Sequence, residues 1–165
     1  MSPTWRRLRR RSSSRERGAA LVELAAALLV LMIVLVGTID FGRVMYTALA
    51  VTQAARAGAE FGAQSTANSN NPTGMINAAQ NAVQSDIGTV TIPTPTKTCR
   101  CVPNNPTTTG DLDTASVACT ATCSSVQHLV AVVTVNASKQ FSTISFYPGI
   151  PRTLTITRAM RARVR

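Results

Sequence analysis

Residues 17–39 read RGAALVELAAALLVLMIVLVGTI. From Ala19 to Ile39 this run has 21 residues, close to the roughly 20 that a helix needs to cross a bilayer. Residues 24–39 carry no charge. A single segment can satisfy its own backbone hydrogen bonds in lipid only as a helix, so residues 19–39 are predicted to form a transmembrane helix.

A strongly basic segment precedes this run. Seven of the 17 Lys and Arg residues lie in the first 17 positions, opposed only by Glu16, and the formal charge of the chain is +10. From Ala19 onward ten basic residues face six acidic ones. Basic residues beside a span stay on the cytoplasmic side. The sequence therefore predicts a cytoplasmic leader (residues 1–18), a single pass, and an extracytoplasmic C-terminus.

The composition argues against an enzyme. Aromatic residues make up 4% and charged residues 15% of the chain, whereas charged residues average about 25% in soluble domains. The chain has one histidine, His128, for which a place at a strand edge is expected. We therefore predict no catalytic residues, no metal site and no cofactor. Asp111 and Asp113 are expected in a solvated loop.

Glu23 lies inside the predicted span. A carboxylate in lipid is unfavourable and usually has a partner. The plain alternative is a side chain that reaches the headgroups or takes up a proton. A secretory signal peptide is the main competing interpretation of the whole region, but its apolar core would be about 7–15 residues and would end in an A-x-A-like site. Here the apolar run is longer and has no such exit.

Arg17, Gly18, Ala19 and Glu23 together resemble the processing site of type IV prepilins and pseudopilins. That resemblance implies cleavage between Gly18 and Ala19 by a membrane aspartic peptidase. The new α-amine of Ala19 would lie one helical turn from the Glu23 carboxylate, because residues four apart are neighbours on a helix. In stacked subunits, Glu23 of one copy could meet the amine of the next and set their register.

The helix is predicted to continue to about Ala63, with residues 40–64 as its extracytoplasmic part. Proline is absent from residues 40–63. Small or apolar residues recur there every three or four positions, which indicates one packing face. Asp40 with Arg43, and Arg56 with Glu60, have the spacing of helical ion pairs.

Residues 16–63 resemble the N-terminal region of the TadE-like family of pseudopilins, which belong to the tight-adherence (Flp) pilus apparatus. The matching stretches are RGAA (17–20), VE (22–23), DFGR (40–43) and QAARAGA (53–59). The resemblance implies a minor pilin or pseudopilin of the inner membrane that takes part in assembling an adhesive pilus and that can itself be incorporated in the pilus. Its implied partners are the bilayer, a prepilin peptidase, other pilins or pseudopilins, and an inner-membrane assembly platform.

Residues 65–165 are expected to form a small α+β domain, with the long helix packed on an antiparallel sheet. A polar turn is predicted at 65–72, a short helix at 75–87 and a strand at 89–92. Residues 129–137 read as a strand whose inward side chains are the odd-numbered ones. In a last strand, 153–165, the predicted apolar face comprises Leu154, Ile156, Met160, Ala162 and Val164. An aromatic loop is predicted between these two strands, with Phe146 and Tyr147.

Four cysteines, Cys99, Cys101, Cys119 and Cys123, lie in the exported part. Disulfides persist outside the cytoplasm, so two bridges are favoured over a metal site or free thiols. Three connectivities are open, and the nested one (Cys101 with Cys119, Cys99 with Cys123) suits a hairpin.

Two alternatives to the pilin interpretation stay open. One is a plain membrane-anchored extracytoplasmic domain. The other is a DNA-capturing pseudopilin that uses the basic strand face at Arg161, Arg163 and Arg165. Nucleic acid is the weaker expectation, because few aromatic residues are interleaved for base stacking.

Overall fold

The computed structural model describes residues 12–83, 88–104, 115–144, 149 and 151–165, with side chains from residue 18 onward. The described elements are α1 (Ser12–Ala63), α2 (Thr66–Ser69), α3 (Pro72–Asn81), β1 (Thr96–Pro103), β2 (Gln127–Ser142) and β3 (Thr153–Arg163). The chain divides after Gly42 into two units, and α1 contributes to both. The predictions made for Ile87, Asp111, Asp113, Phe146 and Tyr147 fall outside the described residues.

The first unit contains the apolar half of α1. Residues 18–35 of this helix are all exposed; among the large hydrophobic side chains, Leu21 and Val22 are the most exposed, at 67% and 72%. Among the described residues, one helix, Gly18–Ala63, is long and apolar enough to cross a membrane by length and composition. The prediction of one long N-terminal helix is confirmed.

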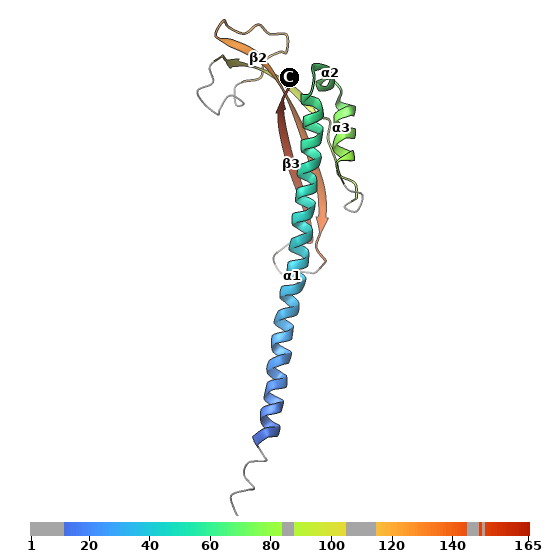
Figure 1. Cartoon of the computed structure of the whole chain (residues 1–165), viewed down its shortest axis with the longest axis vertical. Helices are drawn as coiled ribbons and strands as arrows, with labels where there is room; N and C mark the ends of the chain where they lie inside the picture. Colours follow the sequence, from blue (N-terminus) through green and yellow to red (C-terminus); the bar gives the residue numbers. More distant parts are fainter. Residues whose placement is uncertain (1–11, 84–87, 105–114, 145–148, 150) are drawn as a thin grey trace, which may run out of the picture. The chain divides into compact units, whose positions relative to one another are not determined.

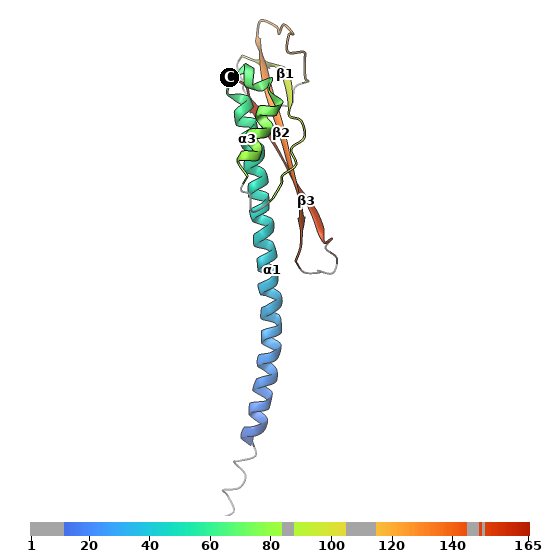
Figure 2. The ribbon, with the colours of Figure 1, turned by 90° about the vertical axis from the view of Figure 1, so that its right-hand side faces the viewer.

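The second unit, Arg43–Arg165, is built on a three-stranded antiparallel sheet in the order β1-β2-β3. Figures 1 and 2 show the sheet beside the C-terminal half of α1, with α3 against that same half. The end of the chain returns to the end of α1, where the Arg165 amide donates to the Ala63 carbonyl at 3.0 Å. The α+β prediction is confirmed.

The core joins α1, α3 and one face of the sheet. From α1 it takes fully buried small side chains: Val51, Ala54, Ala55 and Ala59. Met75 and Ala79 of α3 join them, and the sheet supplies Val133, Val135 and Ala137. Met160 and Ala162 of β3 pack against this core together with Val164, which directly follows the strand, as the predicted apolar face requires. Small helical side chains allow the helix to approach the sheet closely.

The connection after α1 is more ordered than the predicted polar turn. The side chain of Ser65 accepts from the Asn68 amide and caps the short helix α2. Asn71 caps α3 in the same way, accepting from the Gly74 amide at 2.9 Å, and Pro72 follows at the start of the helix. The helix predicted at 75–87 therefore begins at Pro72 and ends at Asn81. The strand predicted at 89–92 is reduced to one bridge, Thr91 with Ser138.

The inward set predicted for β2 is correct only in part. Val133, Val135 and Ala137 are buried against the helices, but Leu129 is 38% exposed. On the opposite face, Val130 and Val132 form a separate buried cluster with Val102. The Val164 amide donates to the Ala131 carbonyl, and the next amide, that of Arg165, donates to the Ala63 carbonyl at the end of α1. The helix therefore ends near the level of Ala131 in β2. Beyond that level nothing from α1 covers the odd-numbered side chains.

Candidate functional site

The residues predicted for processing and assembly lie on the apolar half of α1. Gly18, Ala19 and Glu23 are all helical and exposed. A Cβ on Gly18 would meet no atom within 4 Å, and Gly18 does not have a positive φ. Neither packing nor backbone conformation in this chain therefore requires glycine at position 18.

Glu23 is surrounded along the helix by exposed apolar side chains. Its neighbours Val22 and Leu24 are 72% and 56% exposed. Since α1 is unbroken from Ser12, positions 19 and 23 stand one helical turn apart on the same side of the helix. The unbroken helix thus places the backbone nitrogen of Ala19 and the side chain of Glu23 one turn apart, and their predicted roles in processing and assembly stay predictions.

The second half of α1 is a packing helix. Gly58 and Gly62 face α3 and β2 at very short range: a Cβ on Gly62 would lie 2.5 Å from the Met75 sulfur. On the exposed side, Arg56 Nε donates to Glu60 Oε1 at 2.6 Å, which confirms that predicted ion pair. At the start of this half of α1, the Arg43 guanidinium lies 5.2 Å from the centre of the Phe141 ring. Sequence reasoning missed this contact, because the two residues are 98 positions apart.

The four cysteines form two disulfides, Cys99–Cys119 and Cys101–Cys123. The prediction of two bridges is confirmed, and the nested pairing is wrong. Cys99 and Cys101 lie on one face of β1, two residues apart. The Cα atoms of the bridged pairs are 5.0 Å and 5.6 Å apart.

The route of the chain after residue 114 explains the observed pairing. The Val117 amide donates to the Cys99 carbonyl at 2.8 Å, so the returning chain first meets β1 at Cys99. It then advances along β1 until Gln127 pairs with Pro103, where β2 begins. Cys119 is reached first and pairs with Cys99; Cys123 comes later and pairs with Cys101. A simple hairpin would have reversed this order.

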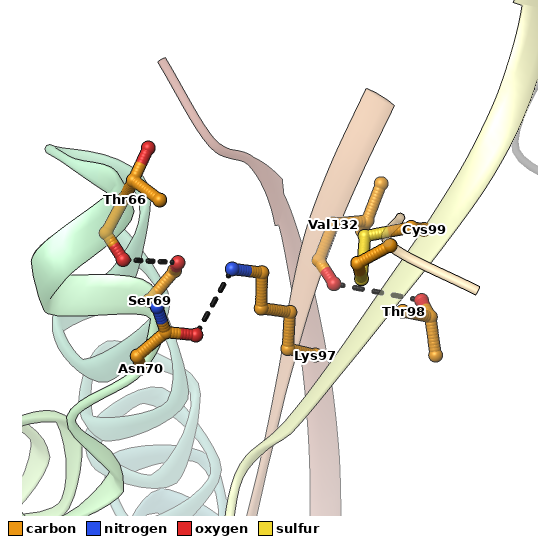
Figure 3. The surroundings of a disulfide bond; sticks show 8 residues. Thr66, Ser69, Asn70, Lys97, Thr98, Cys99 and Val132 are labelled. Carbon is orange, nitrogen blue, oxygen red and sulfur yellow. Dashed lines mark hydrogen bonds between the residues drawn. A yellow bond between two sulfur atoms is a disulfide. The ribbon is translucent and has the colours of Figure 1, made fainter. Parts of the chain in front are cut away.

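Polar contacts tie the disulfide-bonded strand to its surroundings. Lys97 Nζ donates to Asn70 Oδ1 at 3.0 Å, which connects β1 to the end of α2 (Figure 3). Within α2, Ser69 Oγ donates to the Thr66 carbonyl at 2.7 Å. Figure 3 also shows the Thr98 hydroxyl directed toward the Val132 carbonyl, at 3.5 Å.

His128 has two hydrogen-bond partners. Its Nδ1 lies 3.0 Å from Asn104 Oδ1, and its Nε2 lies 3.0 Å from the Arg163 guanidinium. Because guanidinium only donates, Nε2 accepts and the Nδ1 hydrogen goes to Asn104. Through these two contacts, His128 of β2 connects the residue that follows β1 to Arg163 of β3. Within the described part of the chain, no group of three or more His, Cys, Asp or Glu side chains could hold a metal ion.

These features define a class: an α+β protein with one N-terminal helix that could anchor it in a membrane and a disulfide-bonded unit beyond it. Residues 18–60 match the family model described as TadE-like protein, which is about a quarter of the chain. The TadE-like resemblance is therefore confirmed over this region, which begins at Gly18. No curated protein and no solved structure matches the chain.

The match over residues 18–60 suggests a protein associated with the Tad pilus, with partners among the components of pilus assembly in general. TadE-like proteins are a structural, pilus-associated family that is not known for enzymatic activity. The apolar helix agrees with a membrane-anchored pilus protein.

Proposed function

We propose that this protein is a minor pilin or pseudopilin that takes part in assembly of an adhesive Flp-type pilus. The observation that carries the proposal is the coincidence of the TadE-like match, which starts at Gly18, with an unbroken exposed apolar helix that holds one carboxylate, Glu23. A plain anchor would have no use for that carboxylate.

The proposed maturation is hydrolysis of the Gly18–Ala19 peptide bond by a prepilin peptidase. Water supplies the hydroxyl to the Gly18 carbonyl carbon and a proton to the Ala19 nitrogen, and the released amine takes up a further proton. The basic leader leaves on the cytoplasmic side. The ammonium of Ala19 and the Glu23 carboxylate then neutralise each other, within one helix or between stacked copies.

The remainder of the chain is assigned to the other side of the inner membrane. Residues 19–39 would span it, 40–64 would continue the helix outside, and 65–165 would form the extracytoplasmic domain. Two disulfides in residues 99–123 support this orientation, since such bonds persist in oxidising compartments. The partners we propose are the prepilin peptidase, other pilins and the inner-membrane platform.

Mass spectrometry of the mature N-terminus in a host with the pilus system tests the processing step. We expect a chain that begins at Ala19. An intact leader, or loss of the entire apolar run, would contradict the proposal.

Glu23→Gln tests the assembly step, with Glu60→Gln as the matched control. Both remove one carboxylate from an exposed position of α1, but Glu60 lies outside the span and pairs with Arg56. We expect Glu23→Gln to reduce maturation or pilus yield, and Glu60→Gln to change neither. Unchanged processing and pili in Glu23→Gln would favour a plain membrane-anchored domain.

A further inference from the structure

The face of the sheet that points away from α1 carries a pocket of about 190 Å³. Its lining is Thr96, Thr98, Arg100, Val132, Thr134 and Arg161. These residues come from all three strands, and the pairing register places Thr96 opposite Thr134 and Thr134 opposite Arg161. Directly opposite residues of antiparallel strands share a face. The pocket therefore lies across the width of the sheet, wholly within the unit Arg43–Arg165.

The guanidinium of Arg100 is incompletely satisfied in this pocket. Its Nε is buried and has no hydrogen-bond partner in the described part of the chain. A buried donor without an acceptor is unfavourable, because it has lost its hydration and gained nothing in return. Native structures usually satisfy such a group with protein, water or a ligand, and a ligand for a guanidinium must supply acceptor oxygens.

The charge around the pocket favours an anion. Among side chains that the structure describes, the carboxylates are Glu23, Asp40 and Glu60, and all three lie on α1. The described part of the sheet has cations instead, with Arg163 next to Arg161 along the same face of β3. Charges of one sign around a concave surface raise the local concentration of opposite ions.

We propose that this pocket is a binding site for a phosphate group. Two guanidinium groups offer paired N–H donors, which match the spacing of oxyanion oxygens. Threonine hydroxyls at positions 96 and 134, which also line the pocket, add further donors. Donors that come from several directions suit the four oxygens of phosphate better than the two of a carboxylate. A volume of about 190 Å³ also leaves room for bridging waters, since about 10–15 Å³ of cavity volume measured in this way is enough to hold one water.

The test is a titration of the full chain in detergent micelles with inorganic phosphate, against chloride at equal ionic strength. Equilibrium dialysis of labelled phosphate gives the bound fraction. We expect saturable binding of one phosphate, weakened at least tenfold by Arg100→Gln and by Arg161→Gln. Arg158→Gln is the matched control: it removes the same charge from the same strand, but Arg158 does not line the pocket. We expect it to change affinity less than twofold.

Thr134→Val keeps the test decisive if an arginine variant does not fold. It removes one hydroxyl from the lining of the pocket with little change of side-chain volume, and we expect weaker phosphate binding with unchanged thermal unfolding. Absence of saturable binding in the wild type would overturn the proposal. An equal loss in Arg158→Gln would overturn it as well, because it would show general charge attraction.

A parallel titration with glycerol 1-phosphate distinguishes the two sources of the group. Equal or tighter binding with the same dependence on Arg100 and Arg161 would indicate phosphate carried on a larger surface molecule. Binding of inorganic phosphate alone would indicate the free ion. None of these measurements depends on leader cleavage or pilus formation, so the pocket and the proposed function are tested separately.

Discussion

A Cβ atom added to Gly58 would lie 2.9 Å from the carbonyl oxygen of Met75. The obstacle is backbone, which cannot move aside as the end of a flexible side chain can. The same Cβ would also lie 3.1 Å from Val135 and 3.2 Å from Ala79. Helix α1 therefore contacts α3 and β2 at this point only because position 58 has no side chain.

Gly58→Ala is expected to destabilise the protein by about 1–2 kcal/mol. Overpacking a filled core costs about 1–3 kcal/mol, and alanine returns up to about 1 kcal/mol of helix propensity. Denaturant unfolding of the full chain in detergent measures the difference. Gly42→Ala is the matched control, because a Cβ there meets nothing within 4 Å. A Gly58→Ala variant as stable as Gly42→Ala would show that the helices separate easily.

Proteolytic mapping without reduction is expected to yield the pairs Cys99–Cys119 and Cys101–Cys123. Trypsin cuts after Arg100 and so separates Cys99 from Cys101, while elastase can cut after Ala121, between the other two. The fragment with Cys99 should then be joined to the fragment that ends at Ala121. Its recovery with Cys123 would instead support the nested pairing.

Replacing either cystine by two serines should lower the free energy of unfolding by about 3 kcal/mol. The bridges close loops with sequence separations of 20 and 22, and loops of this size give about 3 kcal/mol in the chain-entropy model. Because the two loops overlap, removing both bridges should cost less than the sum of the single losses. Additive losses, measured by denaturant unfolding, would mean that the two bridges act independently.

A double-mutant cycle with Arg43→Met and Phe141→Leu is expected to give a coupling of about 0.5–1 kcal/mol, the range for a partly exposed cation–π pair. The ring of Phe141 is 5% exposed and the Arg43 guanidinium lies over it. Thermal or denaturant unfolding of the four proteins gives the value. A second cycle, with Arg56→Met in place of Arg43→Met, should give no coupling, because Arg56 pairs with Glu60. Equal couplings in both cycles would contradict a specific contact.

Asn71→Ala should destabilise the protein by about 1 kcal/mol, since it removes the oxygen that caps α3. Asn71→Asp retains an acceptor at the same place and should preserve most of the stability. Comparing the unfolding midpoints of the two variants separates the capping bond from the loss of side-chain volume. A similar loss in both would assign the effect to packing.

The sequence was sufficient for the features that depend on local periodicity. A continuous apolar run predicts α1 whatever surrounds it. Small or apolar side chains every three or four positions predict only part of its packing face: Ala55 and Ala59 are buried, whereas Phe41 and Met45 of the same pattern are 63% and 46% exposed. The alternation of Leu154, Ile156, Met160, Ala162 and Val164 similarly predicts the inner face of β3. In each case neighbouring residues carry the whole signal.

Features that depend on the path of the chain could not be predicted in this way. The disulfide pairing follows from where Val117 meets β1, and no residue between Cys101 and Cys119 records that meeting point. In β2, the odd-numbered side chains from Val133 to Ala137 are buried but Leu129 is exposed, because α1 ends beside the strand between these positions. The pocket at Arg100 and Arg161 needs the register of three strands at once, whereas only the basic face of β3 was visible in the sequence.

The bond between the Val117 amide and the Cys99 carbonyl has a consequence for how copies of this protein can associate. It occupies a hydrogen-bonding group on the outer side of β1, which would otherwise be open to a strand from another molecule. The two disulfides hold the segment from Val117 to Cys123 against this edge of β1. Reduction would release it and leave β1 as a template for edge-to-edge aggregation, so an oxidising environment protects solubility as well as stability.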